Sequence, residues 1–215
     1  MKRLRRLQAM AALSAALAAP AQAAPDCSAY AQELATMAEA ADAVRSRVDY
    51  LAPPEDAAAA RHLAQLALVE RANGARLGAL MAACGWPRRS VEGLEAARRA
   101  WLIVQQRADD LPLQRQAVRQ LELAALDGEA AMTHLAAASD RLAVREGRPQ
   151  RYGTQLRPVD ACSWDYYPLD DPGRVEARRR RIGLPTLAEH KRSIDAMIIT
   201  ENCPAPRMNN PGTRQ

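Results

Sequence analysis

The spacing of apolar residues predicts that most of this chain is helical. Between residues 28 and 145, apolar side chains recur at alternating intervals of three and four, which places them on one face of an α-helix. In the first stretch this face carries Leu34, Met37, Ala41 and Val44. We expect helices at residues 28–49, 55–84, 91–109, 110–127 and 129–145.

Prolines, glycines and short polar residues mark the ends of these helices. Pro53 and Pro54 end the first helix, because proline lacks an amide hydrogen and clashes with the preceding turn. The sequence Gly85-Trp86-Pro87 ends the second. Ser90 is expected to cap the third helix, and Asp110 to lie at the positive end of the fourth.

Two of these helices carry further expectations. In the second helix the Asn73-Gly74 pair is a weak point that is expected to bend or split it. In the third helix the apolar stripe is expected to include Leu94, Trp101 and Val104.

The pattern changes after Pro149. Alternation at Tyr152, Thr154 and Leu156, followed by several aromatic residues, predicts a short hairpin or ordered loop within residues 150–169. A basic helix follows at about 172–182, and Thr186 caps a last helix. The expected fold is mainly α, a single helical domain of about six to seven helices with one short β-hairpin-like segment.

Residues 1–23 have the pattern of a secretory signal peptide. A basic start precedes an apolar run at 9–19, which is too short to span a bilayer, and Ala21-Gln22-Ala23 is a cleavage motif after Ala23. An ordinary amphipathic first helix is the alternative. The signal predicts a periplasmic or secreted protein with a helical domain at 24–203 and a flexible tail at 204–215.

Removing the signal peptide changes the charge of the chain. The formal net charge is +5, and residues 1–23 carry four basic and no acidic residues, so the mature chain carries +5 − 4 = +1. We therefore do not expect a nucleic-acid partner, nor a transmembrane segment after cleavage. The basic run Arg178–Arg181 predicts a solvated helix face, with one arginine turned inward towards Asp165, Asp170 or Asp171. An anion-binding surface is the alternative.

Four cysteines remain in the mature chain, and an even number in an exported protein suggests two disulfides. Three pairings are possible. The favoured one joins Cys27 to Cys84 and Cys162 to Cys203. No C-x-x-C motif and no His-x-x-x-His pair is present, so no metal site and no cofactor is predicted.

Several motifs between about residues 66 and 190 together resemble one bacterial family, domain-of-unknown-function family 6624. They are Asn73 with Leu77, Gly85-Trp86-Pro87, Trp101 to Gln105, Gln114, Asp140-Arg141, Gly147 with Gln150, Tyr152 to Gln155, Asp170-Asp171-Pro172, and Arg179 with Gly183-Leu184. The resemblance covers more than half of the mature chain and implies no established activity.

The chain departs from the family pattern directly after Gln105. The family usually has His-Ala-Asp there, whereas this chain has Gln106, Arg107 and Ala108. A neighbouring imidazole and carboxylate can exchange protons or hold a metal, and neither Gln nor Ala can do so near neutral pH. Asp109 points about 100° further round the helix. The resemblance therefore implies a diverged member that has lost any catalysis the pattern marks.

The candidate binding site lies between the third helix and the turn at Tyr152–Gln155. Its residues are Gln105, Asp109, Gln114, Asp140, Arg141, Tyr152, Thr154 and Gln155. Arg141 is expected to form an ion pair with Asp109 or Asp110 of the neighbouring helix.

Three functions remain open for this cluster. The first is a non-catalytic binding or interaction module for a small molecule or an envelope protein. The second is an envelope hydrolase-like enzyme that uses Asp140, Arg141 and Gln155. The third is a purely structural cluster that fixes the hairpin. No catalytic residue is assigned, because no nucleophile or phosphate-loop motif is present.

Overall fold

The computed structural model describes residues 25–160 and 162–198. These residues form a mainly α-helical domain with one short antiparallel hairpin, which confirms the predicted fold class. The elements in order are η1 (Cys27–Ala29), α1 (Tyr30–Arg45), α2 (Ala57–Cys84), α3 (Leu94–Gln106), α4 (Leu111–Leu126), α5 (Met132–Arg145), β1 (Leu156–Pro158), β2 (Trp164–Tyr166), α6 (Pro172–Arg181) and α7 (Leu187–Ile198).

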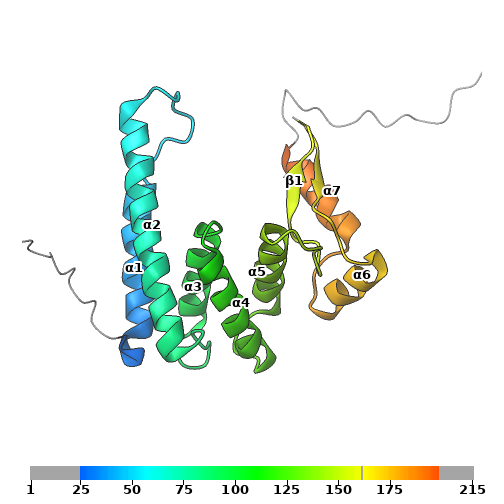
Figure 1. Ribbon diagram of the computed structural model, residues 1–215, viewed down its shortest axis with the longest axis horizontal. Coiled ribbons are helices and arrows are strands. Elements are labelled where there is room, and N and C mark those ends of the chain that lie inside the picture. Colours follow the sequence, from blue (N-terminus) through cyan, green and yellow to red (C-terminus); the bar gives the residue numbers. More distant parts are fainter. Residues whose placement is uncertain (1–24, 161, 199–215) are drawn as a thin grey trace, which may run out of the picture.

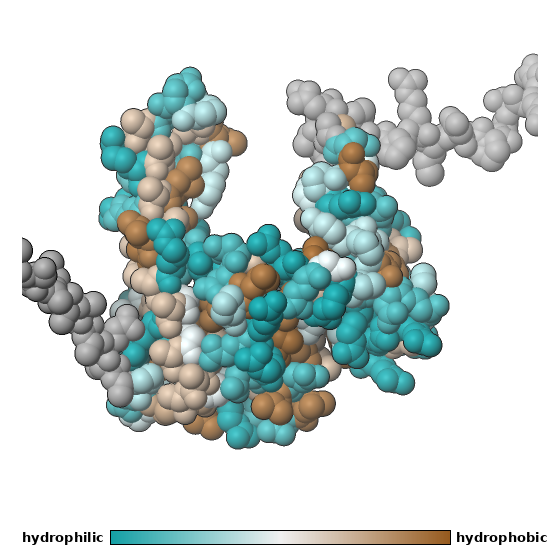
Figure 2. Space-filling view, viewed as in Figure 1, coloured by the Kyte–Doolittle hydropathy of each residue, from teal (hydrophilic) through white to brown (hydrophobic). Residues whose placement is uncertain are grey.

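The helices α1 to α5 stand in a row, and the hairpin with α6 and α7 follows beyond α5 (Figure 1). In the hairpin, Leu156 lies opposite Tyr166 and Pro158 opposite Trp164. The Tyr166 hydroxyl lies 2.9 Å from the carbonyl oxygen of Leu187, which ties the hairpin to α7. Between the upper part of the α1–α2 pair and the hairpin the surface is hollowed (Figure 2).

The apolar core is built by α1 to α5, with the loop residue Trp86. The predicted inward faces of α1, α2 and α4 are confirmed, since Leu34, Leu77 and Leu121 are all buried. The stripe predicted for α3 is partly wrong, because Leu94 is 73% exposed. The helix buries Ala97, which belongs to the same predicted stripe, together with Ala96 and Ala100, and these small side chains allow it to approach α1 and α2 closely.

The α2 helix is continuous through Asn73 and Gly74, so this weak point does not split it. The Asn73 side-chain amide donates a 2.8 Å hydrogen bond to the carbonyl oxygen of Met37 in α1. A Cβ atom at position 74 would lie 3.0 Å from Cγ of Arg107 and 3.3 Å from Cδ2 of Leu113. Asn73 and Gly74 therefore lie where α2 packs closely against α1 and against the start of α4.

The predicted helix ends are mostly correct, with one exception. The Asp110 carboxylate accepts from the amide of Leu113 and caps α4, and the Thr186 hydroxyl accepts from the amide of Glu189 at the start of α7. Ser90 does not cap α3. Its hydroxyl donates instead to the Glu129 carboxylate, and α3 begins later, after Gly93.

A disulfide joins Cys27 to Cys84, as predicted, with 5.6 Å between the Cα atoms. It fastens the start of α1 to the end of α2. Cys162 is also disulfide-bonded, and its predicted partner Cys203 lies outside the described residues. Among residues 25–160 and 162–198, no helix has the length and apolar character needed to cross a bilayer.

The Cys27–Cys84 disulfide closes a loop with a sequence separation of 57. The double substitution Cys27→Ser, Cys84→Ser is expected to lower the free energy of unfolding by about 4 kcal/mol, because the unfolded chain gains loop entropy. Urea unfolding of the oxidised variant and wild type measures this difference. A loss below about 1 kcal/mol would contradict it.

Candidate functional site

The carboxylate of Asp140 organises the turn that follows α5. Asp140 is completely buried. Its oxygens accept hydrogen bonds from the backbone amides of Arg151, Tyr152 and Thr154, at 2.8, 3.1 and 2.9 Å. The Thr154 hydroxyl adds another bond at 3.1 Å. One side chain therefore binds three backbone amides within four consecutive residues.

Burial raises the pKa of Asp140, and the hydrogen bonds from Thr154, Arg151 and Tyr152 oppose that rise. Both carboxylate oxygens accept bonds from the turn. A general acid or base needs a free oxygen within reach of the substrate. The geometry therefore supports a structural role for Asp140 more than the hydrolase alternative.

Gln150 crosslinks the two ends of the hairpin segment. Its side chain is fully buried, and its amide nitrogen donates to the carbonyl oxygens of Gln155 and Tyr167, both at 3.0 Å. Its amide oxygen accepts from the amide of Gln155 at 2.7 Å. Sequence reasoning did not place Gln150 among the site residues, although its spacing from Gly147 was part of the family resemblance. By contrast, the side chain of Gln155 donates only to the neighbouring Thr154 hydroxyl at 3.0 Å.

Arg179 holds the carbonyl side of the same turn. It is 1% exposed and donates to the carbonyl oxygens of Tyr152, Gly153 and Pro185. One arginine of the basic run was expected to turn inward towards an acid. Arg179 turns inward but binds carbonyl groups, and its neighbour Arg178 pairs with Asp170 at 2.7 Å.

The turn requires glycine at position 153. Gly153 has φ +65°, and a Cβ atom there would lie 2.6 Å from Cδ2 of Leu187 and 3.1 Å from Cδ2 of Leu169. A side chain at position 153 would therefore be strained by its backbone conformation and would force the Leu187 side chain to move.

Two predicted site residues, Gln105 and Arg141, lie at the junction of α3 and α5. We call this junction the α3–α5 seam and define it by Trp101, Gln105, His134 and Arg141. The rings of Trp101 and His134 stack with their centroids 4.3 Å apart. One turn along α3, the carbonyl oxygen of Gln105 accepts a 3.0 Å bond from Arg141. Because Arg141 follows Asp140 directly, the seam adjoins the Asp140 turn.

Arg141 does not form the expected ion pair with Asp109 or Asp110. Those two carboxylates lie 3.2 and 3.8 Å from the guanidinium of Arg107 instead. In the described part of the chain Arg141 has no acidic partner, and burial lowers its pKa. The cause is the direction of α5, which points this side chain at the end of α3 and not at the loop beyond it.

Gln114 has a structural position at the end of α3. It is buried, and its amide nitrogen donates to the carbonyl oxygens of Val104 and Arg107 at 2.6 and 2.9 Å. It thereby satisfies carbonyl groups that the last turn of a helix leaves free. Asp109 is exposed next to it.

The seam contains buried donors that the described residues do not satisfy. The indole nitrogen of Trp101 and the amide nitrogen of Gln105 are both buried and donate to no acceptor among the described residues. A buried unsatisfied donor costs about 1–3 kcal/mol. Because residues i and i+4 of a helix are neighbours on one face, both donors border the same seam.

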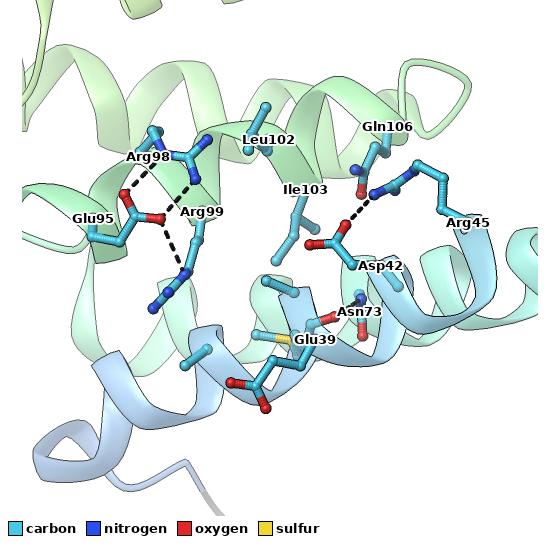
Figure 3. Close-up of a pocket in the computed structure, with 14 residues that line it drawn as sticks. Glu39, Asp42, Arg45, Asn73, Glu95, Arg98, Arg99, Leu102, Ile103 and Gln106 are labelled. Atoms are coloured by element: carbon cyan, nitrogen blue, oxygen red, sulfur yellow. Dashed lines mark hydrogen bonds and ion pairs between the residues drawn. The ribbon is translucent and has the colours of Figure 1, made fainter.

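A cleft of about 150 Å³ lies on the other flank of α3, against α1 (Figure 3). Its wall includes Gln106, the residue that follows Gln105 of the seam. Sequence reasoning missed this cleft, because its charged residues are spread over two helices and form no linear motif. Among the described residues, no group of three or more His, Cys, Asp or Glu side chains is arranged to hold a metal ion.

Comparison with known proteins identifies one family. The model of a family of unknown function, DUF6624, matches residues 28–199, a wider range than the motifs at 66–190. No curated protein and no solved structure matches the chain.

The two glutamines of the turn are expected to differ strongly in their contribution to stability. Gln150→Ala removes three hydrogen bonds from buried backbone groups and should lower the free energy of unfolding by about 3 kcal/mol. Gln155→Ala removes one bond to a hydroxyl and should cost about 1 kcal/mol or less. Urea unfolding measures both, and equal losses would show that this assignment of the network is incorrect.

Stability is expected to fall below about pH 6.5. Burial lowers the pKa of both His134 and His190 from 6.5, so the folded chain resists protonation that the unfolded chain accepts. Their contribution is complete above pH 6.5 and is lost as the pH falls towards the folded pKa. The raised pKa of Asp140 acts with the opposite sign, so the comparison uses the His134→Gln, His190→Gln variant. Its urea midpoint should vary less with pH between 5.5 and 7.5, and parallel curves would contradict this.

Proposed function

Because the chain belongs to the DUF6624 family, whose function is unknown, we propose its role from its geometry: an exported, non-catalytic binding protein that holds a carboxylate-bearing small molecule at the α3–α5 seam. The observation that carries the proposal is Arg141, a half-buried guanidinium with no acidic partner among the described residues.

The chemistry of the seam favours an anionic ligand group. Arg141 uses one nitrogen for the Gln105 carbonyl oxygen, which leaves its other donors for a planar acceptor such as a carboxylate. The unsatisfied donors of Trp101 and Gln105 border the same seam. No acidic side chain pairs with Arg141 in the described structure, so a ligand carboxylate would meet little competition.

Two features support export. The first 23 residues have the signal-peptide pattern, and such segments direct a chain out of the cytoplasm. The disulfide between Cys27 and Cys84 is of the kind that persists in an oxidising compartment. Together they favour a ligand from the cell envelope or its surroundings.

The two alternative functions are supported to different degrees. The hydrolase alternative is weakly supported, because both oxygens of the Asp140 carboxylate accept hydrogen bonds from the turn. A purely structural cluster explains Asp140, Gln150 and Arg179 well. It does not explain Arg141, whose charge is half-buried without an acid to neutralise it.

The test compares two envelope sugars, N-acetylmuramic acid and N-acetylglucosamine, which differ by one lactyl group that carries a carboxylate. The acid should raise the melting temperature of the mature, oxidised protein, and the neutral sugar should not. A ligand at 100 times its Kd stabilises the folded state by about 2.7 kcal/mol. Soluble peptidoglycan fragments extend the panel to larger carboxylates.

The variant Arg141→Met should abolish the shift. Arg119→Met is the matched control, because Arg119 is an exposed arginine on α4, away from the seam. No shift with any carboxylate would overturn the proposal. An equal shift in Arg141→Met would overturn the assignment to the seam.

A further inference from the structure

The cleft between α1 and α3 is a candidate site of its own, separate from the seam on the other flank of α3. Its walls carry three carboxylates (Glu39, Asp42 and Glu95) and three guanidinium groups (Arg45, Arg98 and Arg99). The wall charges balance. A pocket of balanced charge does not favour a simple cation or a simple anion.

The charges are not mixed evenly along the cleft (Figure 3). At one end, Glu95 lies between two arginines. It accepts bonds from Arg98 at 2.7 and 2.9 Å, and Arg99 lies 3.4 Å away. This end has one negative and two positive groups, and the guanidinium of Arg99 is the less engaged of the two.

The opposite end has the reverse balance. Arg45 lies between Asp42 and Glu70, with its guanidinium 3.1 Å from the Glu70 carboxylate. Glu70 does not line the cleft, but Glu39 of α1 does. The α1 wall of the cleft therefore carries one positive group, Arg45, and two negative groups, Glu39 and Asp42. The side chain of Asp42 is 72% exposed, and only one of its oxygens accepts a bond from Arg45.

The wall between the two ends is largely apolar. Leu102 and Ile103 of α3 face Ala38 and Ala41 of α1 there. Asn73 adds one acceptor, because its amide nitrogen is engaged by Met37 and its amide oxygen is not. The volume of about 150 Å³ corresponds to roughly five water molecules. It suits a small molecule of about ten non-hydrogen atoms.

We propose that this cleft binds a small zwitterion whose ammonium and carboxylate groups are separated by a short apolar chain. The carboxylate pairs with Arg99, and the ammonium pairs with Asp42. The apolar chain lies against Leu102 and Ile103. Gln106 lines the ammonium end as an uncharged group and keeps the balance of charges that a histidine would alter with pH.

The site is tested with a series of ω-amino acids. Isothermal titration calorimetry of the mature, oxidised protein is carried out with β-alanine, 4-aminobutyrate, 5-aminopentanoate and 6-aminohexanoate. Affinity should pass through an optimum within the series, because only one length spans both charged ends. Pentylamine and pentanoate, which each lack one charge, should bind at least tenfold more weakly than the best zwitterion.

Two substitutions remove one end each. Arg99→Gln and Asp42→Asn should each weaken the best zwitterion at least tenfold. Arg119→Gln and Glu122→Gln are the matched controls, since both residues are exposed on α4, and they should leave the affinity unchanged. Circular dichroism melting verifies that all four variants fold.

Each other outcome overturns the proposal. If no member of the series binds, the cleft is not a zwitterion site. If pentylamine or pentanoate binds as well as the best zwitterion, one charged end is not used. If binding is lost in Arg141→Met and kept in Arg99→Gln, the ligand occupies the seam instead. The inference does not depend on the seam, so the two proposals can fail separately.

Discussion

The buried carboxylate of Asp140 is the constraint on which the C-terminal part of this structure depends. The cluster of buried apolar residues that forms the core is drawn from α1 to α5 and the loop at Trp86, and none of its members lies in the hairpin, α6 or α7. What joins these last elements to the bundle is largely polar. The Asp140 carboxylate accepts hydrogen bonds from amides of the turn, and the Arg179 guanidinium donates to carbonyl oxygens of the same turn. Two buried groups of opposite charge therefore bind one backbone segment.

This arrangement explains why so many polar residues are buried at one place. Hydrogen bonds to a charged group contribute about 1.5–3 kcal/mol each, more than bonds between neutral groups. Neither charge could be buried alone, because an isolated ion in the interior is strongly unfavourable. Asp140 and Arg179 are buried with several backbone partners each, and Gln150 completes the network between them. A small apolar contact area is therefore sufficient to position the hairpin.

The sequence predicted the helices, the hairpin and the Cys27–Cys84 disulfide, because periodicity, helix breakers and cysteine number are local or countable signals. It did not predict how the polar residues pair. Arg141 was expected to pair with Asp109 or Asp110. It donates instead to the Gln105 carbonyl oxygen, because its direction depends on the rotation of α5 relative to α3. The charged cleft was missed for the same reason: Asp42 and Arg99 are far apart in sequence and come together only when α1 packs on α3.

Helix α3 borders both proposed binding sites, the seam and the cleft. Its inner face uses alanines, which fit close to α1 and α2, so its larger polar side chains remain on the outer face. On one side of α3, Gln105 borders the seam with α5. On the other side, Gln106 lines the cleft with α1. The two flanks differ in how their charges are paired. Arg141 at the seam has no acidic partner among the described residues, whereas the guanidinium groups of the cleft lie beside carboxylates. This difference is the reason why we propose an anionic ligand for the seam and a zwitterion for the cleft.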